Sequence, residues 1–570
     1  MNVSEYIVKF LADKGITDFF GYQGTMIAYF IEAICSNPDV RNHSCYNEQG
    51  AAFAAVGYAK AKGECAVAYA TSGPGALNLV SGIADAYYDS VPVIFITGQI
   101  NTHEYTDIRE LRQQGFQQTD VVGVTSPIAK YSVMIDDVAN VERELEKAWE
   151  IANSGRKGPV VLDIPMNIQK QEMSLCKQEV QSEADEDTVY NFASDILRMV
   201  DEAKRPLLLL GNGISRKITN EVRELVDKLN IPVITTMPAI DLVESQDNRN
   251  LGYIGAAYGF RAANIVAYKK ADLILSLGAS MCRRQTGNPQ KFAENAKIIR
   301  VDLDETELLR KVHDDISYVA DVNKLIPQLL KTEYNGPDRS EWINVCNICK
   351  TRTEEFNSQN AERQPNKVIT YIGKSTVADS VFAIDVGQHQ MWSAQSLQVI
   401  DSRRIIFSGG HGAMGFALPA AIGAYYATGR KTYCIAGDGA FQMNIQELQW
   451  VVREQIPVTI FVMNNNSLGL IRQQQDDFFG ERHYGSTGEG GFTSPSFVDI
   501  GKAYGIESHR VSRPTDIKMF KDEINSMKPV LVEVMLPPDT KAYPKTYFGQ
   551  EMYNQMPYIP QELMDELLSL

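Results

Sequence analysis

The chain has 570 residues, of which 44% are hydrophobic and 22% are charged, as is ordinary for a soluble globular protein. Its 71 acidic residues outnumber its 55 basic ones, and the net charge of −16 argues against a surface that binds nucleic acid. No apolar run is long enough to cross a membrane, and eight scattered cysteines are typical of a reducing compartment. We therefore expect a cytoplasmic protein of three or four domains, with neither a membrane nor a nucleic acid as partner.

The first predicted domain covers residues 1–178 and alternates strands with helices. Its opening helix is amphipathic, unlike a signal peptide, because its apolar residues share one face: Val3, Tyr6, Ile7, Phe10 and Leu11. Apolar runs predict strands over 65–71, 91–97 and 159–164, and helical spacing predicts helices over 51–61 and 76–88. This alternation indicates a parallel sheet. The acidic stretch QEVQSEADEDTV then predicts a linker.

The alternation restarts in a central domain, residues 188–335, with strands predicted over 206–210, 231–235, 273–277 and 298–301. Residues 333–367 form a second predicted linker region that contains a long charged helix. Cys346 and Cys349 in this region form a lone CxxC motif, which we interpret as structural because no second pair accompanies it. A third unit, residues 365–570, completes the chain. The predicted fold class is therefore α/β, with three doubly wound parallel-sheet domains.

The third domain carries the most informative stretch, IAGDGAFQMNIQELQWVVREQIPVTIFVMNNNSLGL. A strand over 433–436 ends in Gly437-Asp438-Gly439, a helix is predicted over 441–454, and a strand over 457–463 ends in three asparagines. The polar residues thus follow the carboxyl ends of two strands, where open α/β sheets bind ligands.

The residue types at these strand ends favour a phosphate and a hard metal ion. Glycines let backbone N–H groups approach a phosphate, and the N-terminus of the following helix favours negative charge. Asp438 offers a carboxylate oxygen, Asn465 an amide oxygen and the backbone near Ser467 a carbonyl oxygen, a set that suits Mg²⁺ better than zinc. An ordinary turn followed by an asparagine-rich loop is the alternative.

The chain also contains an internal repeat. SGPGALNLVSGIADAYYDSVPVIFITG in the first domain parallels GDGAFQMNIQELQWVVREQIPVTIFVMN in the third. Both run from a strand through Gly-x-Gly and a helix to a Pro-containing strand start. The first and third domains are therefore predicted to share one fold, with a site across their interface.

The spacing from Gly-Asp-Gly to Asn-Asn resembles the thiamine diphosphate signature. Further stretches resemble the acetohydroxyacid (acetolactate) synthase large (catalytic) subunit family over nearly the whole chain: TSGPGALNLVSGIADAYYDSVPVIFITGQ, SGRKGPVVLDIP, VGQHQMW and GGHGAMGFALPAAIGA. The resemblance implies a pyrimidine-binding domain, a central domain and a diphosphate-binding domain. It also implies thiamine diphosphate and Mg²⁺ held between two subunits of a homodimer or homotetramer.

The resemblance assigns roles to individual residues. Glu48 matches the acid that contacts the cofactor pyrimidine and would act as a general acid–base, although an acid at a helix start is the alternative. Met414 matches the bulky residue beneath the cofactor, with a core methionine as the alternative. Gln117, with Phe116, matches a pair at the substrate mouth. The implied cofactor-binding residues are Tyr22, Gly24, Gly387, Gln388, His389, Gly412, Met414, Gly437, Asp438, Gly439, Ala440, Asn465, Leu468 and Gly469, and the implied metal ligands are Asp438, Asn465 and Ser467.

The family's central domain holds FAD, and the matching candidates here are Arg156, Gly211, Gly213, Arg284, Asp302 and Asp321. Three positions depart from the family pattern. Met166 replaces a substrate-channel lysine, Gln474 replaces a tryptophan of the acceptor pocket, and Ser280 replaces an arginine that contacts FAD. The loop INTHEYTDIRELRQQG is also longer than the usual synthase version and resembles insertions in relatives that act in polysaccharide or branched-sugar synthesis.

The predicted function is that of an acetolactate synthase-like carboligase, as in branched-chain amino-acid biosynthesis. It would decarboxylate pyruvate and transfer the hydroxyethyl group to a second carbonyl, which for pyruvate gives acetolactate. One alternative keeps this donor and uses a keto-sugar nucleotide as acceptor. A second alternative is a non-catalytic scaffold, against which the intact Glu48, Asp438 and Asn465 argue.

Overall fold

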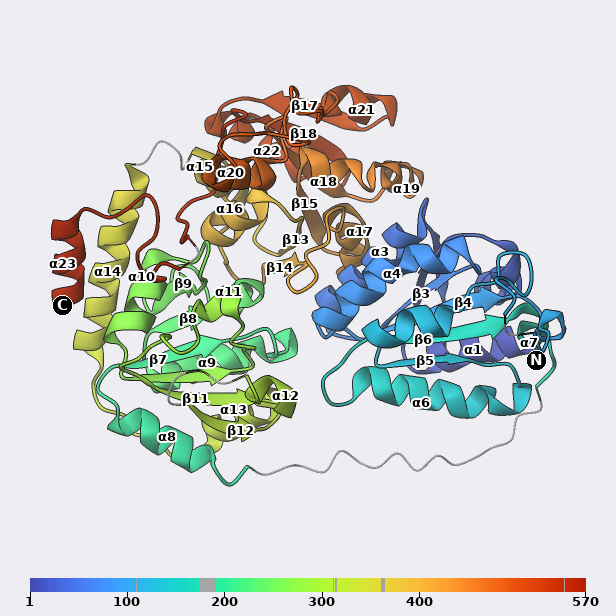
Figure 1. Ribbon diagram of the computed structural model, residues 1–570, viewed down its shortest axis with the longest axis horizontal. Coiled ribbons are helices and arrows are strands. Elements are labelled where there is room, and N and C mark those ends of the chain that lie inside the picture. The colour runs from blue at the N-terminus through green and yellow to red at the C-terminus, as the bar shows by residue number, and fades with distance from the viewer. Residues whose placement is uncertain (109, 174–189, 311, 313–314, 360–363, 548) are drawn as a thin grey trace.

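The computed structural model describes residues 1–570 except 109, 174–189, 311, 313–314, 360–363 and 548. Within these residues the chain forms three six-stranded parallel sheets, each flanked by helices, which confirms the predicted fold class (Figure 1). The central strands are buried along their whole length, which explains why they are continuous apolar runs in the sequence. No helix in the described part of the chain is long and apolar enough to cross a membrane.

The first sheet has the strand order β2-β1-β3-β4-β6-β5. Its strands are β1 (Asp18–Gly21), β2 (Arg41–Ser44), β3 (Ala66–Ala70), β4 (Val93–Gln99), β5 (Tyr131–Met134) and β6 (Val160–Pro165). Its helices are α1 (Val3–Asp13), α2 (Ala28–Ser36), α3 (Glu48–Lys62), α4 (Pro74–Tyr88), α5 (Val121–Thr125), α6 (Val141–Asn153) and α7 (Met166–Gln169). The predicted amphipathic helix is α1, whose apolar face is buried apart from the half-buried Tyr6. The linker predicted over 178–189 lies outside the described residues.

The second sheet has the order β12-β11-β10-β7-β8-β9. Its strands are β7 (Pro206–Leu210), β8 (Val233–Thr235), β9 (Asn250–Tyr253), β10 (Leu273–Leu277), β11 (Lys297–Asp302) and β12 (Asp315–Val319). The helices of this part are α8 (Ala193–Glu202), α9 (Thr219–Leu229), α10 (Arg261–Ile265), α11 (Arg283–Thr286), α12 (Glu305–Leu308), α13 (Val322–Lys331) and α14 (Ser340–Ser358). Each of the four strands predicted here is present.

The third sheet has the order β14-β13-β15-β16-β18-β17, which is the order of the first sheet repeated strand for strand. Its strands are β13 (Ser380–Ile384), β14 (Arg404–Phe407), β15 (Lys431–Gly437), β16 (Val458–Asn464), β17 (Glu507–Val511) and β18 (Val530–Met535). Its helices are α15 (Gln364–Ser375), α16 (Gln388–Ser396), α17 (Ala417–Thr428), α18 (Asp438–Gln442), α19 (Leu448–Arg453), α20 (Gly469–Phe478), α21 (Phe497–Ala503) and α22 (Lys521–Ile524). The internal repeat therefore reflects one topology used twice.

The first and third sheets are joined by helices α3 and α17, which pack in one shared core (Figure 1). Glycines allow the two backbones to approach closely. A Cβ at Gly57 would lie 2.3 Å from the carbonyl oxygen of Ala420, and a Cβ at Gly423 would lie 1.9 Å from that of Ala54. These are closer than real Cβ contacts, so the crossing requires glycine at both positions.

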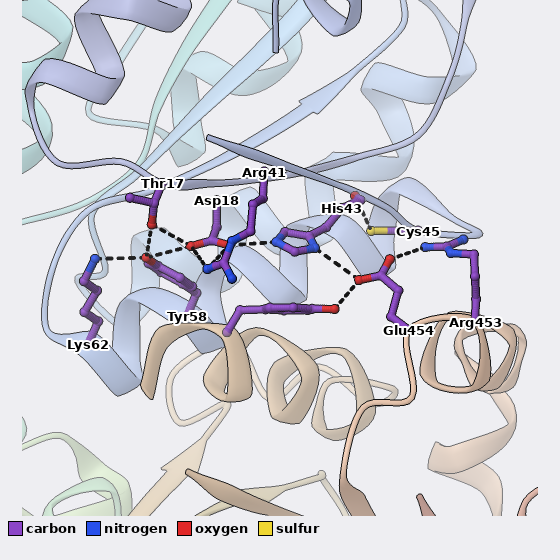
Figure 2. Close-up of polar contacts among 10 residues, drawn as sticks. Thr17, Asp18, Arg41, His43, Cys45, Tyr58, Lys62, Arg453 and Glu454 are labelled. Atoms are coloured by element: carbon purple, nitrogen blue, oxygen red, sulfur yellow. Dashed lines mark hydrogen bonds and ion pairs between the residues drawn. The ribbon is translucent and has the colours of Figure 1, made fainter. Parts of the chain in front are cut away.

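A polar network crosses the same interface (Figure 2). His43 of β2 lies between Asp18 of β1 and Glu454, which follows α19. The imidazole also stacks on the ring of Phe20 and contacts that of Tyr426 at a tilt, with centroids 5.1 and 3.8 Å away. Buried polar groups are therefore paired across the contact between the two related domains.

The helix predicted over 441–454 is interrupted in the structure. It divides into α18, a 3₁₀ turn over Ile445–Glu447 and α19. At the interruption the third domain contacts the first, since Asn444 donates to the side chain of Gln49 as well as to the carbonyl of Gly415 in its own domain. Glu447 accepts a hydrogen bond from the backbone N–H of Tyr46. Tertiary contacts thus override the helical spacing of the sequence.

The helix predicted within 333–367 is α14, and it packs against the helices of the second sheet. The C-terminal helix α23 (Gln561–Ser569) lies beside it (Figure 1), and Arg352 of α14 pairs with Glu566 of α23. Cys346 and Cys349 are buried in this contact, where burial raises the pKa of both thiols. The CxxC motif therefore has the environment of packed core cysteines.

Candidate functional site

The first half of the candidate site lies where β13, β15 and β16 end and α16, α18 and α20 begin. Side chains of α16 connect the three loops. His389 accepts a hydrogen bond from the backbone N–H of Gly437 at 3.2 Å, and Gln388 accepts one from the Asn465 amide at 3.3 Å. Burial lowers the pKa of His389 to about 3, so its imidazole is neutral. We call Gln388, His389, Gly437, Asp438, Asn465 and Ser467 the diphosphate group.

Glycines in these loops are required by close packing. A Cβ at Gly437 would lie 2.9 Å from the His389 ring, and one at Gly469 would lie 2.0 Å from the Gln388 side chain. A Cβ at Gly387 would also contact the His389 imidazole, and one at Gly439 would lie 2.5 Å from the Leu468 side chain. The glycines thus bring the starts of three helices together, and free N–H groups at helix starts favour an anion. Ala440 is buried in the first turn of α18.

Asp438 is the residue of this group that fits a metal ion. It is buried, and its two carboxylate oxygens accept hydrogen bonds from the N–H groups of Gly439 and Ser467 at 2.8 and 3.2 Å. No lysine or arginine in the described part of the chain pairs with it, and burial raises its pKa to about 6. A buried carboxylate without a counter-charge is costly, and a bound cation would offset that cost.

The donors around Asp438 match Mg²⁺ in kind. The side-chain nitrogen of Asn465 donates to Gln388, which leaves its amide oxygen for a ligand, and Ser467 is buried next to the carboxylate. Among the described residues no cluster of three or more His, Cys, Asp or Glu could hold a metal. The site thus combines one carboxylate with neutral oxygens, as a Mg²⁺ that also binds phosphate oxygens requires.

The second half of the candidate site lies at the carboxyl ends of the first sheet. Glu48 is the first residue of α3, follows the N-cap Asn47 and is buried. Its Oε2 accepts a hydrogen bond from the Asn78 amide of α4 at 2.9 Å, and its Oε1 lies 3.0 Å from the position of a Cβ on Gly75. Glu48 therefore lies at a helix start, where an acid is favoured without any catalytic role, and its carboxylate is also held in a fixed orientation toward α4.

The backbone of Gln117 packs against this second half of the site. Its φ of +64° is unusual for a non-glycine residue, and its carbonyl oxygen lies 2.6 Å from the position of a Cβ on Gly73. Gly73 and Gly75 thus join Gln117 to Glu48, and we call Glu48, Gly73, Gly75, Asn78 and Gln117 the Glu48 group. The nearby Phe116 is 78% exposed.

Three further candidates lie in loops. Gly24 packs on Thr71 at the end of β3, and Tyr22 is exposed after β1. Met414 is half-buried in the loop between β14 and α17. Gly412, two residues earlier, has a φ of +71° and no atom within 4 Å of the position of a Cβ, so one side of this loop is open.

The two halves remain separate within one chain. Among the described residues no hydrogen bond or ion pair joins the Glu48 group to the diphosphate group. The cavity of about 420 Å³ between the second and third sheets contains none of the candidate residues, since it is lined by Tyr253, Arg261, Lys350, Gln395 and their neighbours. Neither half therefore shares a contact or this cavity with the other in the described part of the chain.

Family models match three separate stretches of the chain. The N-terminal TPP-binding domain of thiamine pyrophosphate enzymes matches residues 1–124, the central domain matches 193–329, and the C-terminal TPP-binding domain matches 385–534. The acetolactate synthase large subunit of Lactococcus lactis is 34% identical over 545 residues, covering 94% of this chain and 92% of that protein. The chain belongs to this family. It is a thiamine diphosphate-dependent enzyme of the transferase type.

Other members of the acetolactate synthase family align equally well. The isozyme 1 large subunit of Escherichia coli is 34% identical, with 95% of each chain covered. A probable acetolactate synthase large subunit of Methanococcus aeolicus is 33% identical, covering 95% of this chain and 93% of that protein. The resemblance predicted from the motifs is therefore confirmed over the full three-domain architecture.

The FAD candidates of this family member have structural contacts of their own. A Cβ at Gly211 would lie 2.0 Å from the carbonyl oxygen of Gly278, so this position requires glycine. Gly213 packs on the same residue. Arg156 pairs with Asp304 and Glu307. Asp302 and Asp321 accept backbone hydrogen bonds at a turn and at the start of α13, and Arg284 lies in α11. None of these contacts tests FAD binding.

Two of the three positions that depart from the family pattern lie in helices. Met166 begins α7 and is half-buried, and Gln474 is exposed on α20 next to the buried Gln473. Gln473 accepts a hydrogen bond from Gln388, a contact that the sequence did not predict. Its signal is the spacing within α20, which places it on the buried face. Asn78 was also missed, although it stands one helical turn after the Gly-Pro-Gly of α4.

Proposed function

We propose that this enzyme condenses two molecules of pyruvate to acetolactate and CO₂, using thiamine diphosphate and Mg²⁺. The observation that carries the proposal is the diphosphate group, in which an unpaired buried carboxylate, a free amide oxygen and three helix starts meet. Relatives named as acetolactate synthases support it along the whole chain. When bound, thiamine diphosphate supplies a nucleophilic carbon and an electron sink for decarboxylation.

The diphosphate group holds the cofactor's charged end in this proposal. Asp438, Asn465 and the carbonyl of Ser467 are the Mg²⁺ ligands. The N–H groups at the starts of α16 and α20 bind diphosphate oxygens. His389 is buried and neutral, so it adds no charge and acts as an acceptor that holds Gly437 in place.

Glu48 is proposed to exchange a proton with a pyrimidine nitrogen of the cofactor. Asn78 orients its carboxyl group by donating to Oε2, which leaves Oε1 for the cofactor. A positioned carboxyl group of this kind contributes roughly 10²–10⁴-fold to proton transfer. Met414 supports the cofactor from the other domain, and Gln117 contacts the substrate.

We further propose that the active enzyme is a homodimer, or a homotetramer made of two such dimers, with each cofactor between two copies of the chain. The two halves of the site are separate in one copy, so a second copy is needed to complete each of them. Exposed apolar side chains stand within a few residues of candidates from both halves: Tyr22, Leu77, Phe116, Met443 and Ile471. Such side chains are expected to be buried in an interface. Light scattering of the purified protein tests the mass.

The physiological acceptor and FAD are finer points of the same proposal. Pyruvate is the acceptor that the family membership supports, and a keto-sugar nucleotide remains the alternative because of the long loop over 100–115 and Gln474. FAD in the central domain and a cytoplasmic location also remain predictions. A visible absorption spectrum of the purified protein tests for bound flavin.

The decisive experiment supplies pyruvate as the sole substrate, with thiamine diphosphate and Mg²⁺. CO₂ release and NMR identification of acetolactate are expected, and both should stop when either cofactor is omitted. No CO₂ release would contradict the proposal and favour a scaffold. The enzyme could instead release CO₂ without forming acetolactate and form a carboligation product only when a keto-sugar nucleotide is added. That result would keep pyruvate as the donor and replace it as the acceptor.

A further inference from the structure

A buried ion cluster lies where the first domain contacts the loop that leads to Met414. The Lys60 ammonium of α3 lies 2.5 Å from Asp89 and 3.4 Å from Asp85, both at the C-terminal end of α4. The three side chains are nearly inaccessible to solvent. Two carboxylates and one ammonium leave one negative charge without a cationic partner, so this cluster needs further donors.

Those donors come from the third domain. The backbone N–H groups of Gly409 and Gly410 donate to Asp89 at 2.9 and 2.6 Å. The hydroxyl of Ser408 donates to Asp85, and its oxygen in turn accepts from the backbone N–H of Ala413 at 2.9 Å. These bonds pin both ends of the segment 408–413, which immediately precedes Met414.

The glycines of this segment fit the same interpretation. A Cβ at Gly410 would lie 2.9 Å from the Tyr88 side chain and 3.0 Å from Asp89, and one at Gly409 would lie 2.9 Å from Pro238. The backbone therefore approaches the end of α4 as closely as glycine permits. Lys60 adds a third attachment by donating to the carbonyl of Phe407 at 2.7 Å.

Helix α4 contacts the Glu48 group at its start and the segment before Met414 at its end. At its start, Asn78 holds Glu48, and Gly75 lies against the same carboxylate. At its end, Asp85 and Asp89 hold the segment before Met414. A helix of 15 residues is about 22 Å long, so one rigid element relates the two positions.

We propose that Lys60, Asp85 and Asp89 are positioning residues for the carboligase reaction, which act by fixing residues 408–413 and thereby the position of Met414. The inference rests on the proposed role of Met414 beneath the cofactor. None of the three residues touches substrate or cofactor in this proposal. The diphosphate group is independent of them, so losing the cluster should disturb the geometry of the cofactor more than its binding.

The first test uses the protein without cofactor. In Asp89→Asn the segment should lose its charged acceptor, and peptides covering 408–416 should exchange amide hydrogens faster in mass spectrometry. Glu144→Gln is the matched control, because Glu144 is a buried acid of the same domain whose partners are Tyr131 and Arg143. Unchanged exchange of the segment in Asp89→Asn would overturn the inference.

The second test is a double-mutant cycle between Asp89→Asn and Met414→Ala, read as exchange of the cofactor's thiazolium proton by NMR. Each single variant should bind the cofactor with Mg²⁺ and exchange roughly 10–100-fold more slowly, the usual effect of a misplacement of about 1 Å. The double variant should be no slower than Met414→Ala, because both changes act through one side chain. Additive effects would contradict the inference.

The outcomes also separate this inference from the proposed function. Normal proton exchange in Met414→Ala would remove the proposed role of Met414, and the inference would fall with it. Slow exchange in Met414→Ala but not in Asp89→Asn would remove the positioning role alone. If Asp89→Asn does not fold, Ser408→Ala decides, since it deletes a single hydroxyl between Asp85 and Ala413. It should show the same faster amide exchange and slower proton exchange, and wild-type values in both would overturn the inference.

Discussion

The imidazole of His43 in the first domain lies 3.4 Å from the carboxylate of Glu454 in the third. Its other nitrogen lies 2.7 Å from Asp18, so one histidine bridges two acids across the domain contact (Figure 2). Other polar groups surround these acids: Thr17, Arg41, Tyr58, Tyr426 and Arg453. Burial alone would lower the pKa of His43, but hydrogen bonds to the two carboxylates outweigh it and raise the pKa. The two acids therefore favour the protonated form of the histidine that joins the domains.

We expect this bridge to make stability depend on pH. The pKa of His43 is higher in the folded than in the unfolded protein, so its contribution is complete below about pH 6.5 and is lost as pH rises through the folded value. The pKa of Asp18 is lowered and that of Glu454 is lowered to about 2, so their contributions are lost as pH falls. Urea denaturation should therefore show a falling free energy of unfolding above about pH 6.5, with a slope of up to about 1.4 kcal/mol per pH unit.

His43→Gln should remove that slope, because glutamine cannot take up a proton. His103→Gln is the control, since His103 is exposed on the surface of the first domain. A slope in His43→Gln equal to that of the wild-type protein would show that another group is responsible.

Asp438→Ala should abolish Mg²⁺-dependent cofactor binding, because it removes the anionic ligand and leaves only neutral oxygens. Changes to groups around metal ligands cost roughly 10–100-fold in affinity, so loss of the ligand itself should exceed that range. A fluorescence titration with thiamine diphosphate and Mg²⁺ measures it. Wild-type affinity in this variant would contradict the assignment of Asp438.

Glu48→Gln should leave cofactor binding intact and slow loss of the thiazolium proton by about 10²–10⁴-fold. Glutamine keeps the size of glutamate and can still pair with Asn78, but it cannot exchange the proton. Hydrogen–deuterium exchange of the bound cofactor, followed by NMR, measures the rate. An unchanged rate would leave Glu48 with its structural role at the start of α3.

Gln474→Trp should raise the preference for 2-ketobutyrate over pyruvate as acceptor. The exposed glutamine offers a polar amide, whereas an indole favours the extra methyl group by about 1–3 kcal/mol. Competition between the two acceptors, with product identification, tests this. If the wild-type protein already prefers 2-ketobutyrate tenfold, about 1.4 kcal/mol, this interpretation of Gln474 is wrong.

Gly423→Ala should destabilise the protein by about 1–3 kcal/mol, the usual cost of overpacking a core. The added methyl group would meet the carbonyl oxygen of Ala54 on the facing helix. Gly488→Ala is the matched control, because the nearest atom to its Cβ position is 3.9 Å away. Equal thermal stability of the two variants would show that α3 and α17 can separate at little cost.

Local order along the chain was enough to predict the three α/β units, the repeat and the strand ends that carry Asp438 and Asn465. The physical reason is that buried parallel strands are continuous apolar runs, and a turn that must admit a phosphate or a close backbone needs glycine. Glu48 and Met414 could be singled out only through the family resemblance, since a lone acid or methionine has many local explanations.

Tertiary structure decided what depends on partners far apart in the sequence. The helical spacing of 441–454 gives no sign of its interruption, because the partner of Asn444 is the side chain of Gln49 in another domain. Asp89 has no local motif, yet it accepts a hydrogen bond from Gly410, and Asp18 and Glu454 together raise the pKa of His43. These hydrogen bonds and pKa shifts depend on burial and on partners from another domain. Both are set only when the first and third sheets pack together through α3 and α17.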